Sequence, residues 1–123
     1  MPQYMLLIFS DPSQGPAEGS PEAMAEWQAW GSYTQGLKDA GVFVSGEPLE
    51  APTTATTVAV RNGDRVVTDG PFAETKEQLA GFYILECKDL DEAVEWAARI
   101  PTGCKGKPGC IEIRPVADLP QVP

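Results

Sequence analysis

Histidine is absent from this 123-residue chain, and cysteine is scarce. The three cysteines, Cys87, Cys104 and Cys110, form no Cys-x-x-Cys pair, whereas a structural zinc site needs about four cysteine or histidine ligands. The sequence therefore predicts no bound transition metal, and it indicates no cofactor. Cys104 and Cys110 are near enough in sequence to form a disulfide. In a reducing compartment we expect free thiols instead, and the sequence leaves this redox state open.

Basic residues are also few: nine Lys and Arg stand against 18 Asp and Glu, which gives a net charge of −9. An acidic chain is repelled by phosphate backbones and anionic lipid, so we expect neither nucleic acid nor a membrane as partner. No apolar run approaches the ~20 residues that cross a bilayer. Residues 1–9 lack the basic start and cleavage site of a secretory signal. We therefore expect a cytoplasmic protein.

The residues that are present predict one α+β domain spanning residues 1–123, long enough to bury a core of its own. Residues 4–9 and 80–87 are apolar on both alternating faces, which is typical of strands covered on both sides. Asn62-Gly63 lies between two further strands and predicts a tight hairpin turn. Residues 42–45 and 111–114 predict two more strands, the first ending in a Gly46-Glu47-Pro48 turn.

Two helices are predicted between these strands. Ser20-Pro21-Glu22 is typical of a helix start, and Gly41 of a helix end. The helical spacing predicts a buried face made of Ala23, Trp27, Trp30, Thr34 and Leu37. Asp89 and Glu92 predict the capping box of the second helix, which Pro101 ends. Its predicted buried face consists of Leu90, Val94 and Ala97.

The order of these elements is the ferredoxin-like pattern with an enlarged middle hairpin. In that fold two helices cover one face of an antiparallel sheet and leave the other face bare. Because residues 4–9 and 80–87 are apolar on both faces, the bare face would expose a large apolar surface to water. We therefore expect this face to be buried against a second copy of the chain, in a homodimer.

Residues 66–86 run Val-Val-Thr-Asp-Gly-Pro-Phe-Ala-Glu-Thr-Lys-Glu-Gln-Leu-Ala-Gly-Phe-Tyr-Ile-Leu-Glu. This block closely resembles the DGPF proteins, a branch of the YCII-related family, and residues 4–8, 45–49 and 111–116 also look like family segments. The resemblance implies a ferredoxin-like homodimer of the dimeric α/β-barrel type, a bacterial origin, and for many relatives genes beside extracytoplasmic-function sigma factors. It implies no reaction. YCII-type relatives carry a histidine in a Pro-x-His segment, where this chain has Ala23, so their acid–base pair cannot be transferred.

The segment around the DGPF motif is the leading candidate for a binding site. Asp69, Glu74, Lys76 and Glu77 place four ionisable groups within nine residues, beside Phe72. In a cavity, a carboxylate there could act as a base and Lys76 could hold an anionic group. The alternative is structural: Asp69 caps its own turn, Phe72 fills the core and the other charges are solvated. Trp30, with Trp27 and Tyr33, could stack on a planar ligand, although the helical stripe favours core packing.

Two functions from different classes remain open. One is a protein that binds a small molecule in a cleft near the DGPF loop and the dimer interface, with or without catalysis. The other is a non-catalytic regulatory protein that contacts a sigma factor or another protein. The sequence does not say whether the protein is an enzyme. A buried, charged pocket beside Asp69 would favour the first function, and a featureless groove with an exposed apolar rim would favour the second.

Overall fold

The computed structural model describes residues 1–11, 13, 15–73, 75–101 and 110–120. A four-stranded antiparallel sheet has the order β2-β5-β1-β6, and a separate two-stranded sheet consists of β3 and β4. The main strands are β1 (Gln3–Ser10), β2 (Phe43–Pro48), β5 (Gln78–Glu86) and β6 (Ile111–Pro115). The helices are α1 (Pro21–Asp39) and α2 (Leu90–Ala98), and a 3-10 turn, η2, covers Pro52–Thr54. This α+β arrangement is compatible with the ferredoxin-like pattern.

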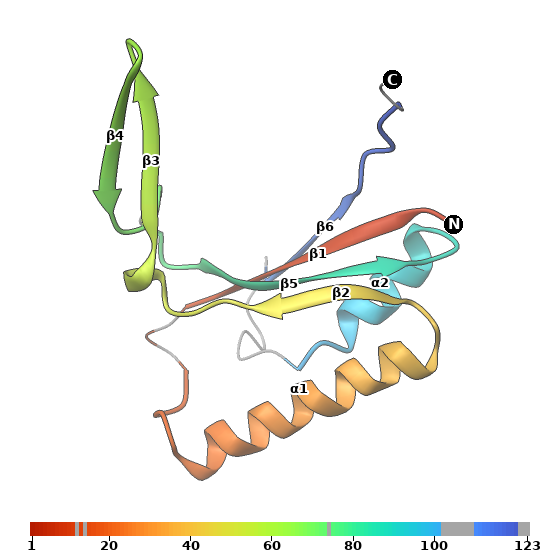
Figure 1. The fold of residues 1–123 in the computed structure, drawn as a ribbon. Coiled ribbons are helices and arrows are strands. Elements are labelled where there is room, and N and C mark those ends of the chain that lie inside the picture. The colour runs from red at the N-terminus through yellow and green to blue at the C-terminus, as the bar shows by residue number, and fades with distance from the viewer. Residues whose placement is uncertain (12, 14, 74, 102–109, 121–123) are drawn as a thin grey trace.

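Both helices lie on one side of the main sheet (Figure 1). Tyr4, Leu6 and Ile8 of β1 alternate toward that side and are buried, as are Tyr83 and Leu85 of β5. The helices add Tyr33, Leu37 and Ala93 to the same core. The Tyr33 hydroxyl donates to the Trp96 carbonyl oxygen at 2.8 Å and so ties α1 to α2. None of the helices in the described part of the chain is long and apolar enough to cross a membrane.

Helix starts follow the predicted capping patterns. The Ser20 side chain accepts a hydrogen bond from the Ala23 N–H at 3.2 Å, with Pro21 as the first residue of α1. The Asp89 carboxylate accepts from the Glu92 N–H at 2.9 Å at the start of α2. Gly41 follows α1 with φ of +75°, as a glycine after a helix end does. The local sequence therefore determines where α1 and α2 begin and where α1 ends.

Two side-chain predictions are wrong. In α2, Leu90 and Val94 are half exposed, and Ala93 faces the core instead. Ala93 is fully buried in the core cluster, so the face of α2 that contains it is turned toward the sheet. In α1, Trp27 is 63% exposed, because the buried residues of that helix, Tyr33 and Leu37, lie in its C-terminal half.

The predicted turn at Gly46-Glu47-Pro48 is also wrong, since these residues continue β2 along β5. Neighbouring strands decide this point: Gly46 pairs with Tyr83, and Pro48 pairs with Gly81. Cys87 is a buried free thiol, but Cys110 is disulfide-bonded. The expectation of a free thiol at Cys110 is therefore wrong, because it considered the redox compartment and not the fold. Cys104 lies outside the described residues.

The face of the main sheet opposite the helices is apolar. Met5, Leu7 and Phe9 of β1 pair there with Ile84, Phe82 and Leu79 of β5. These side chains are partly exposed, and Leu79 reaches 38%. Figure 1 shows the helices on the other side of the sheet, whereas the β3–β4 hairpin stands up on this side. Within one chain, the central strands therefore bury only the apolar face that packs against the helices, and their other apolar face stays partly exposed.

The hairpin joins β3 (Thr56–Arg61) to β4 (Asp64–Asp69) through Asn62 and Gly63, which both have positive φ, as predicted. It pairs only with itself. Four valines, Val58, Val60, Val66 and Val67, are between 42% and 72% exposed on it. An isolated two-stranded hairpin is marginally stable in water, and these valines leave apolar surface exposed on it.

Candidate functional site

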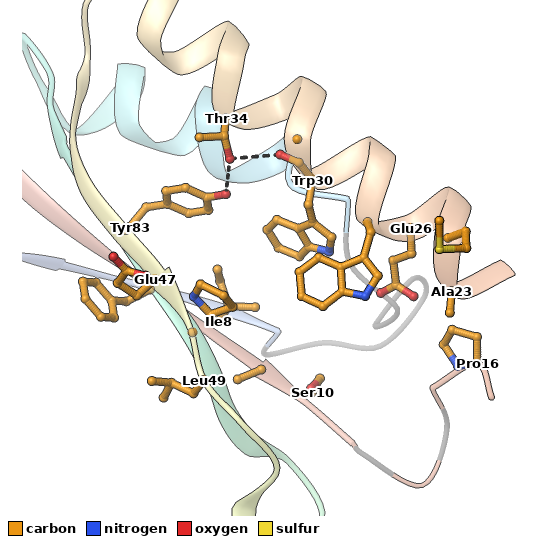
Figure 2. Close-up of a pocket in the computed structure, with 18 of the residues that line it drawn as sticks. Ile8, Ser10, Pro16, Ala23, Glu26, Trp30, Thr34, Glu47, Leu49 and Tyr83 are labelled. Atoms are coloured by element: carbon orange, nitrogen blue, oxygen red, sulfur yellow. Dashed lines mark hydrogen bonds between the residues drawn. The ribbon is translucent and has the colours of Figure 1, made fainter. Parts of the chain in front are cut away.

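A cavity of about 830 Å³ lies between α1 and the main sheet. Helix α1 forms one wall, β2 and β5 form the opposite wall, and the end of β1 closes the floor at Ile8 and Ser10. Figure 2 shows Trp30, Thr34 and Tyr83 at one end of this space and Pro16 and Ala23 at the other. Its volume falls in the range of small-molecule sites.

The cavity exists because small residues stand on both of its walls. Ala23 and Gly31 face it from α1, and Gly46, Ala80 and Gly81 face it from the sheet. A Cβ atom at Gly46 would lie only 2.5 Å from Cδ1 of Tyr83, and one at Gly81 would lie 2.9 Å from the Glu47 carbonyl oxygen. These two glycines let β2, β5 and the Tyr83 ring pack closely. A Cβ at Gly31, by contrast, would meet no atom within 4 Å, so this position opens onto free space.

Aromatic rings form the inner end of the cavity. The rings of Trp30 and Tyr83 are stacked, with centroids 6.2 Å apart and planes at 19°. Tyr33 contacts both rings edge-on from the core side. Trp27 lines the same space and keeps most of its surface exposed. Trp30 therefore packs partly against the core and partly lines the cavity, and its stacking on a ligand stays a prediction.

Two hydrogen-bonded hydroxyl groups, those of Thr34 and Tyr83, make the aromatic end of the cavity polar at one place. The Thr34 hydroxyl lies 2.9 Å from the Trp30 carbonyl oxygen, to which it donates, and 2.6 Å from the Tyr83 hydroxyl oxygen. Because Thr34 has a single hydroxyl hydrogen, Tyr83 donates to Thr34 in this arrangement. The Tyr83 oxygen then retains lone pairs that can accept a hydrogen bond. Burial raises the pKa of Tyr83, so its phenol stays protonated at neutral pH.

Charged groups are unevenly distributed around the cavity. Glu18 and Glu26 line its outer end, and Figure 2 shows the Glu26 carboxylate directed toward the open space. Lys38 lies at the other end with its nitrogen 5.1 Å from the centre of the Phe43 ring. In the described part of the chain, no group of three or more cysteine, aspartate or glutamate side chains could hold a metal ion.

The residues predicted around the DGPF motif do not come together in this cavity. Asp69 ends β4 and is exposed, and Phe72 is 93% exposed. Lys76 and Glu77 line a separate, shallow hollow of about 450 Å³ with Phe9, Thr75 and Glu112. Glu74 lies outside the described residues. Of the described residues predicted for a site, Trp30 and Trp27 line the large cavity.

Backbone and side-chain hydrogen bonds of other residues hold the DGPF segment in place. The Gly70 N–H donates to the Ala55 carbonyl oxygen, and the Thr57 hydroxyl donates to the Gly70 carbonyl oxygen, both at 2.8 Å. The Gln78 amide nitrogen lies 3.0 Å from the Ala73 carbonyl oxygen and 2.8 Å from that of Thr75. Asp69 has no side-chain hydrogen bond within the described residues, and Phe72 does not fill the core. The structural roles considered for these two residues are therefore wrong for the single chain.

Sequence reasoning misses most of the residues that shape the cavity. It places Gly46 in a turn, although a strand glycine often marks a close approach of a neighbouring group. Gly31 lies within the continuous helix α1, and a Cβ atom there would meet no atom within 4 Å. The pairing of Thr34 with Tyr83 joins residues 49 positions apart, and no local pattern predicts it.

The fold and cavity define a small α+β domain with an antiparallel sheet, two helices on one face and a hollow beneath the first helix. Residues 3–120 match the YCII-related domain. An uncharacterised protein of Rhizobium meliloti (strain 1021) is 34% identical over 114 residues, which cover 93% of this chain and 91% of that protein. The chain therefore belongs to the YCII-related family. Ala23 lies at the outer end of the cavity.

Proposed function

We propose that this protein binds a small, largely apolar molecule in the cavity between α1 and the sheet. The observation that carries the proposal is a hollow of about 830 Å³ whose inner end is built of Trp30 and Tyr83 and whose walls are kept open by small residues. Aromatic walls with a few polar groups are typical of such sites. The proposal concerns binding and assigns no reaction. The site lies beneath α1 and not at Asp69.

Filling the cavity from Gly31 tests this proposal. A leucine at Gly31 would extend into open space, and it would also favour the helix by somewhat less than about 1 kcal/mol relative to glycine. Gly36 is the matched control, because it lies in the same helix, does not line the cavity and would also accept a Cβ atom with no neighbour within 4 Å. Titration with the neutral dye N-phenyl-1-naphthylamine, followed by fluorescence, measures occupancy.

We expect Gly31→Leu to weaken dye binding roughly tenfold or more by steric exclusion, whereas Gly36→Leu should retain wild-type affinity. Both variants should melt at least as high as the wild type, which shows that the fold is intact. Equal dye affinity in all three proteins would contradict the proposal, because the dye would then occupy another surface, such as the bare face of the sheet.

A homodimer is part of the same proposal. Its support is the apolar sheet face of Met5, Leu7 and Phe9 with their partners on β5, and the exposed valines of the hairpin that rises beside it (Figure 1). Lys76 and Glu77 lie next to Phe9 and Glu112, so a second copy on this face would also enclose their shallow hollow. In that case the DGPF segment would border the interface.

The alternative function, a regulatory contact with a sigma factor or another protein, has one observation in its favour. Phe72 is 93% exposed at the base of the hairpin, and exposed aromatic residues are frequent anchors of protein interfaces. The variant Phe72→Ser separates the alternatives. It should leave dye binding in the cavity unchanged, but it should abolish capture of a sigma factor if that contact is the function.

A further inference from the structure

The charges around the α1 cavity indicate which class of small molecule fits it. This inference rests on the proposed function and adds the charge of the ligand. Glu26 is the central observation: it is partly buried, its carboxylate points toward the cavity, and it has no hydrogen bond or ion pair among the described residues. A carboxylate that is partly removed from water gains most from a positively charged partner.

The aromatic walls favour the same kind of ligand. Trp27 and Trp30 present indole rings to the space beside Glu26, and the ring faces of tryptophan attract cations more strongly than those of tyrosine or phenylalanine. An organic cation with an aromatic body can therefore be stabilised in three ways: by stacking of its ring, by cation–π attraction to the indole faces, and by ion pairing with the Glu26 carboxylate. An anion would gain from stacking alone.

The positive groups of the cavity do not offset this preference. Lys38 is a described basic residue on the lining, and its nitrogen already lies over the Phe43 ring at 5.1 Å. The start of α1 carries a partial positive charge, but Glu18 and Glu22 lie beside it, and Ser20 accepts the Ala23 N–H. The outer end of the cavity is therefore acidic.

The hydrogen-bonding groups also match a ligand that donates. The Tyr83 oxygen retains acceptor capacity because its hydrogen is directed to Thr34. The Gln35 amide nitrogen donates to Asp39 at 2.9 Å, which leaves the amide oxygen of this lining residue as an acceptor. We propose that the cavity selects a largely apolar molecule with a planar aromatic body, a positive charge and N–H donors, such as an arylalkylamine that is protonated at neutral pH.

Three indole compounds that differ in charge test the proposal: tryptamine, which is cationic at pH 7, neutral 3-ethylindole, and anionic indole-3-propionate. Affinities can be measured with ¹⁵N-labelled protein by NMR, with the indole N–H signals of Trp27 and Trp30 as reporters. We expect tryptamine to bind roughly tenfold more tightly than 3-ethylindole and the anion to bind most weakly. Added salt should reduce this spread.

Glu26→Gln should remove most of the advantage of tryptamine and leave 3-ethylindole unchanged. Glu95→Gln is the matched control, because it removes the same charge from the exposed surface of α2 and should change neither affinity. Equal binding of the three compounds, or preference for the anion, would overturn the charge assignment while the cavity remained a binding site. Absence of binding by all three would contradict both this inference and the proposed function.

Discussion

At the scale of single residues, Cys87 shows how burial is linked to stability in this chain. Its thiol follows β5, is fully buried, and its backbone N–H donates to the Pro2 carbonyl oxygen at 3.1 Å. Burial, and to a smaller extent the nearby carboxylates of Glu92 and Asp89, raise the pKa of Cys87 from an ordinary value of 9.0 to about 11. The folded chain therefore keeps this thiol protonated at mildly alkaline pH.

We predict that the contribution of Cys87 to the free energy of unfolding is level well below pH 9 and falls as pH rises from about 9 toward 11. In this window the unfolded chain has lost the Cys87 proton while the folded chain still holds it, so rising pH favours unfolding by up to about 2 kcal/mol. Urea unfolding at pH 8, 9 and 10 measures the effect. Tyr33 and Tyr83 also have raised pKa values, but their unfolded forms ionise near pH 10, so they contribute at the upper end of the window.

Cys87→Ala provides the control for this prediction. The variant should be less stable at pH 8, because it leaves a small void in the core, but its stability should change much less between pH 8 and pH 9.5. A wild-type protein whose stability does not fall in that interval, or a variant with the same fall, would show that the thiol is not the cause.

Individual residues also show where sequence reasoning reaches its limit. Ser20 and Asp89 are predictable as helix caps, because a cap interacts with backbone N–H groups only three positions away. For Trp27 the helical spacing predicts burial, and the structure leaves this residue largely exposed. The N-terminal half of α1, where Trp27 lies, borders the cavity, whereas the buried residues Tyr33 and Leu37 lie in its C-terminal half, and no local pattern reveals this division.

At the scale of elements, the hairpin and the central strands are predictable from alternation and from the Asn62-Gly63 turn, because those signals are local. The length of β2 is not predictable from local signals. Residues 46–48 have the composition of a turn, but pairing with β5 extends them, and the Leu49 N–H continues the ladder to the Ala80 carbonyl oxygen at 2.8 Å. Tertiary pairing overrides local preference here, and it builds one wall of the cavity.

The DGPF segment gives a testable prediction at this scale. Because the Gln78 amide holds the Ala73 and Thr75 carbonyl oxygens, we expect Gln78→Ala to lower the free energy of unfolding by about 1 kcal/mol. Asp69→Asn should lower it by less than about 0.5 kcal/mol, since the exposed carboxylate makes no described hydrogen bond. Urea unfolding of both variants measures this difference, and a larger loss for Asp69→Asn would reverse the assignment.

At the scale of the whole molecule, a single chain leaves part of its apolar surface uncovered. The sheet face of Met5, Leu7 and Phe9 and the valines of the hairpin lie on the side that no helix covers (Figure 1). The sequence predicts this imbalance, because residues 4–9 and 80–87 are apolar on both faces. It cannot show that the hairpin stands beside the same face, since this depends on how β3 leaves η2 at the end of the main sheet.

The final prediction is a dimer that joins two copies of this face. Sedimentation at micromolar concentration should give about twice the chain mass of 13.2 kDa. Each copy carries a charge of −9, so repulsion opposes association and added salt should strengthen it. A monomer at all salt concentrations would contradict the prediction.

Two aspartate variants locate the interface. Leu79→Asp places a charge on the bare sheet face at a residue that is already 38% exposed, so the fold should tolerate it while the dimer dissociates. Val94→Asp is the matched control on the outer surface of α2, where the side chain is 49% exposed. It adds the same charge but should leave the dimer intact, because α2 lies on the opposite side of the sheet. If Val94→Asp dissociates the dimer and Leu79→Asp does not, the copies meet through their helices and the apolar sheet face has another partner.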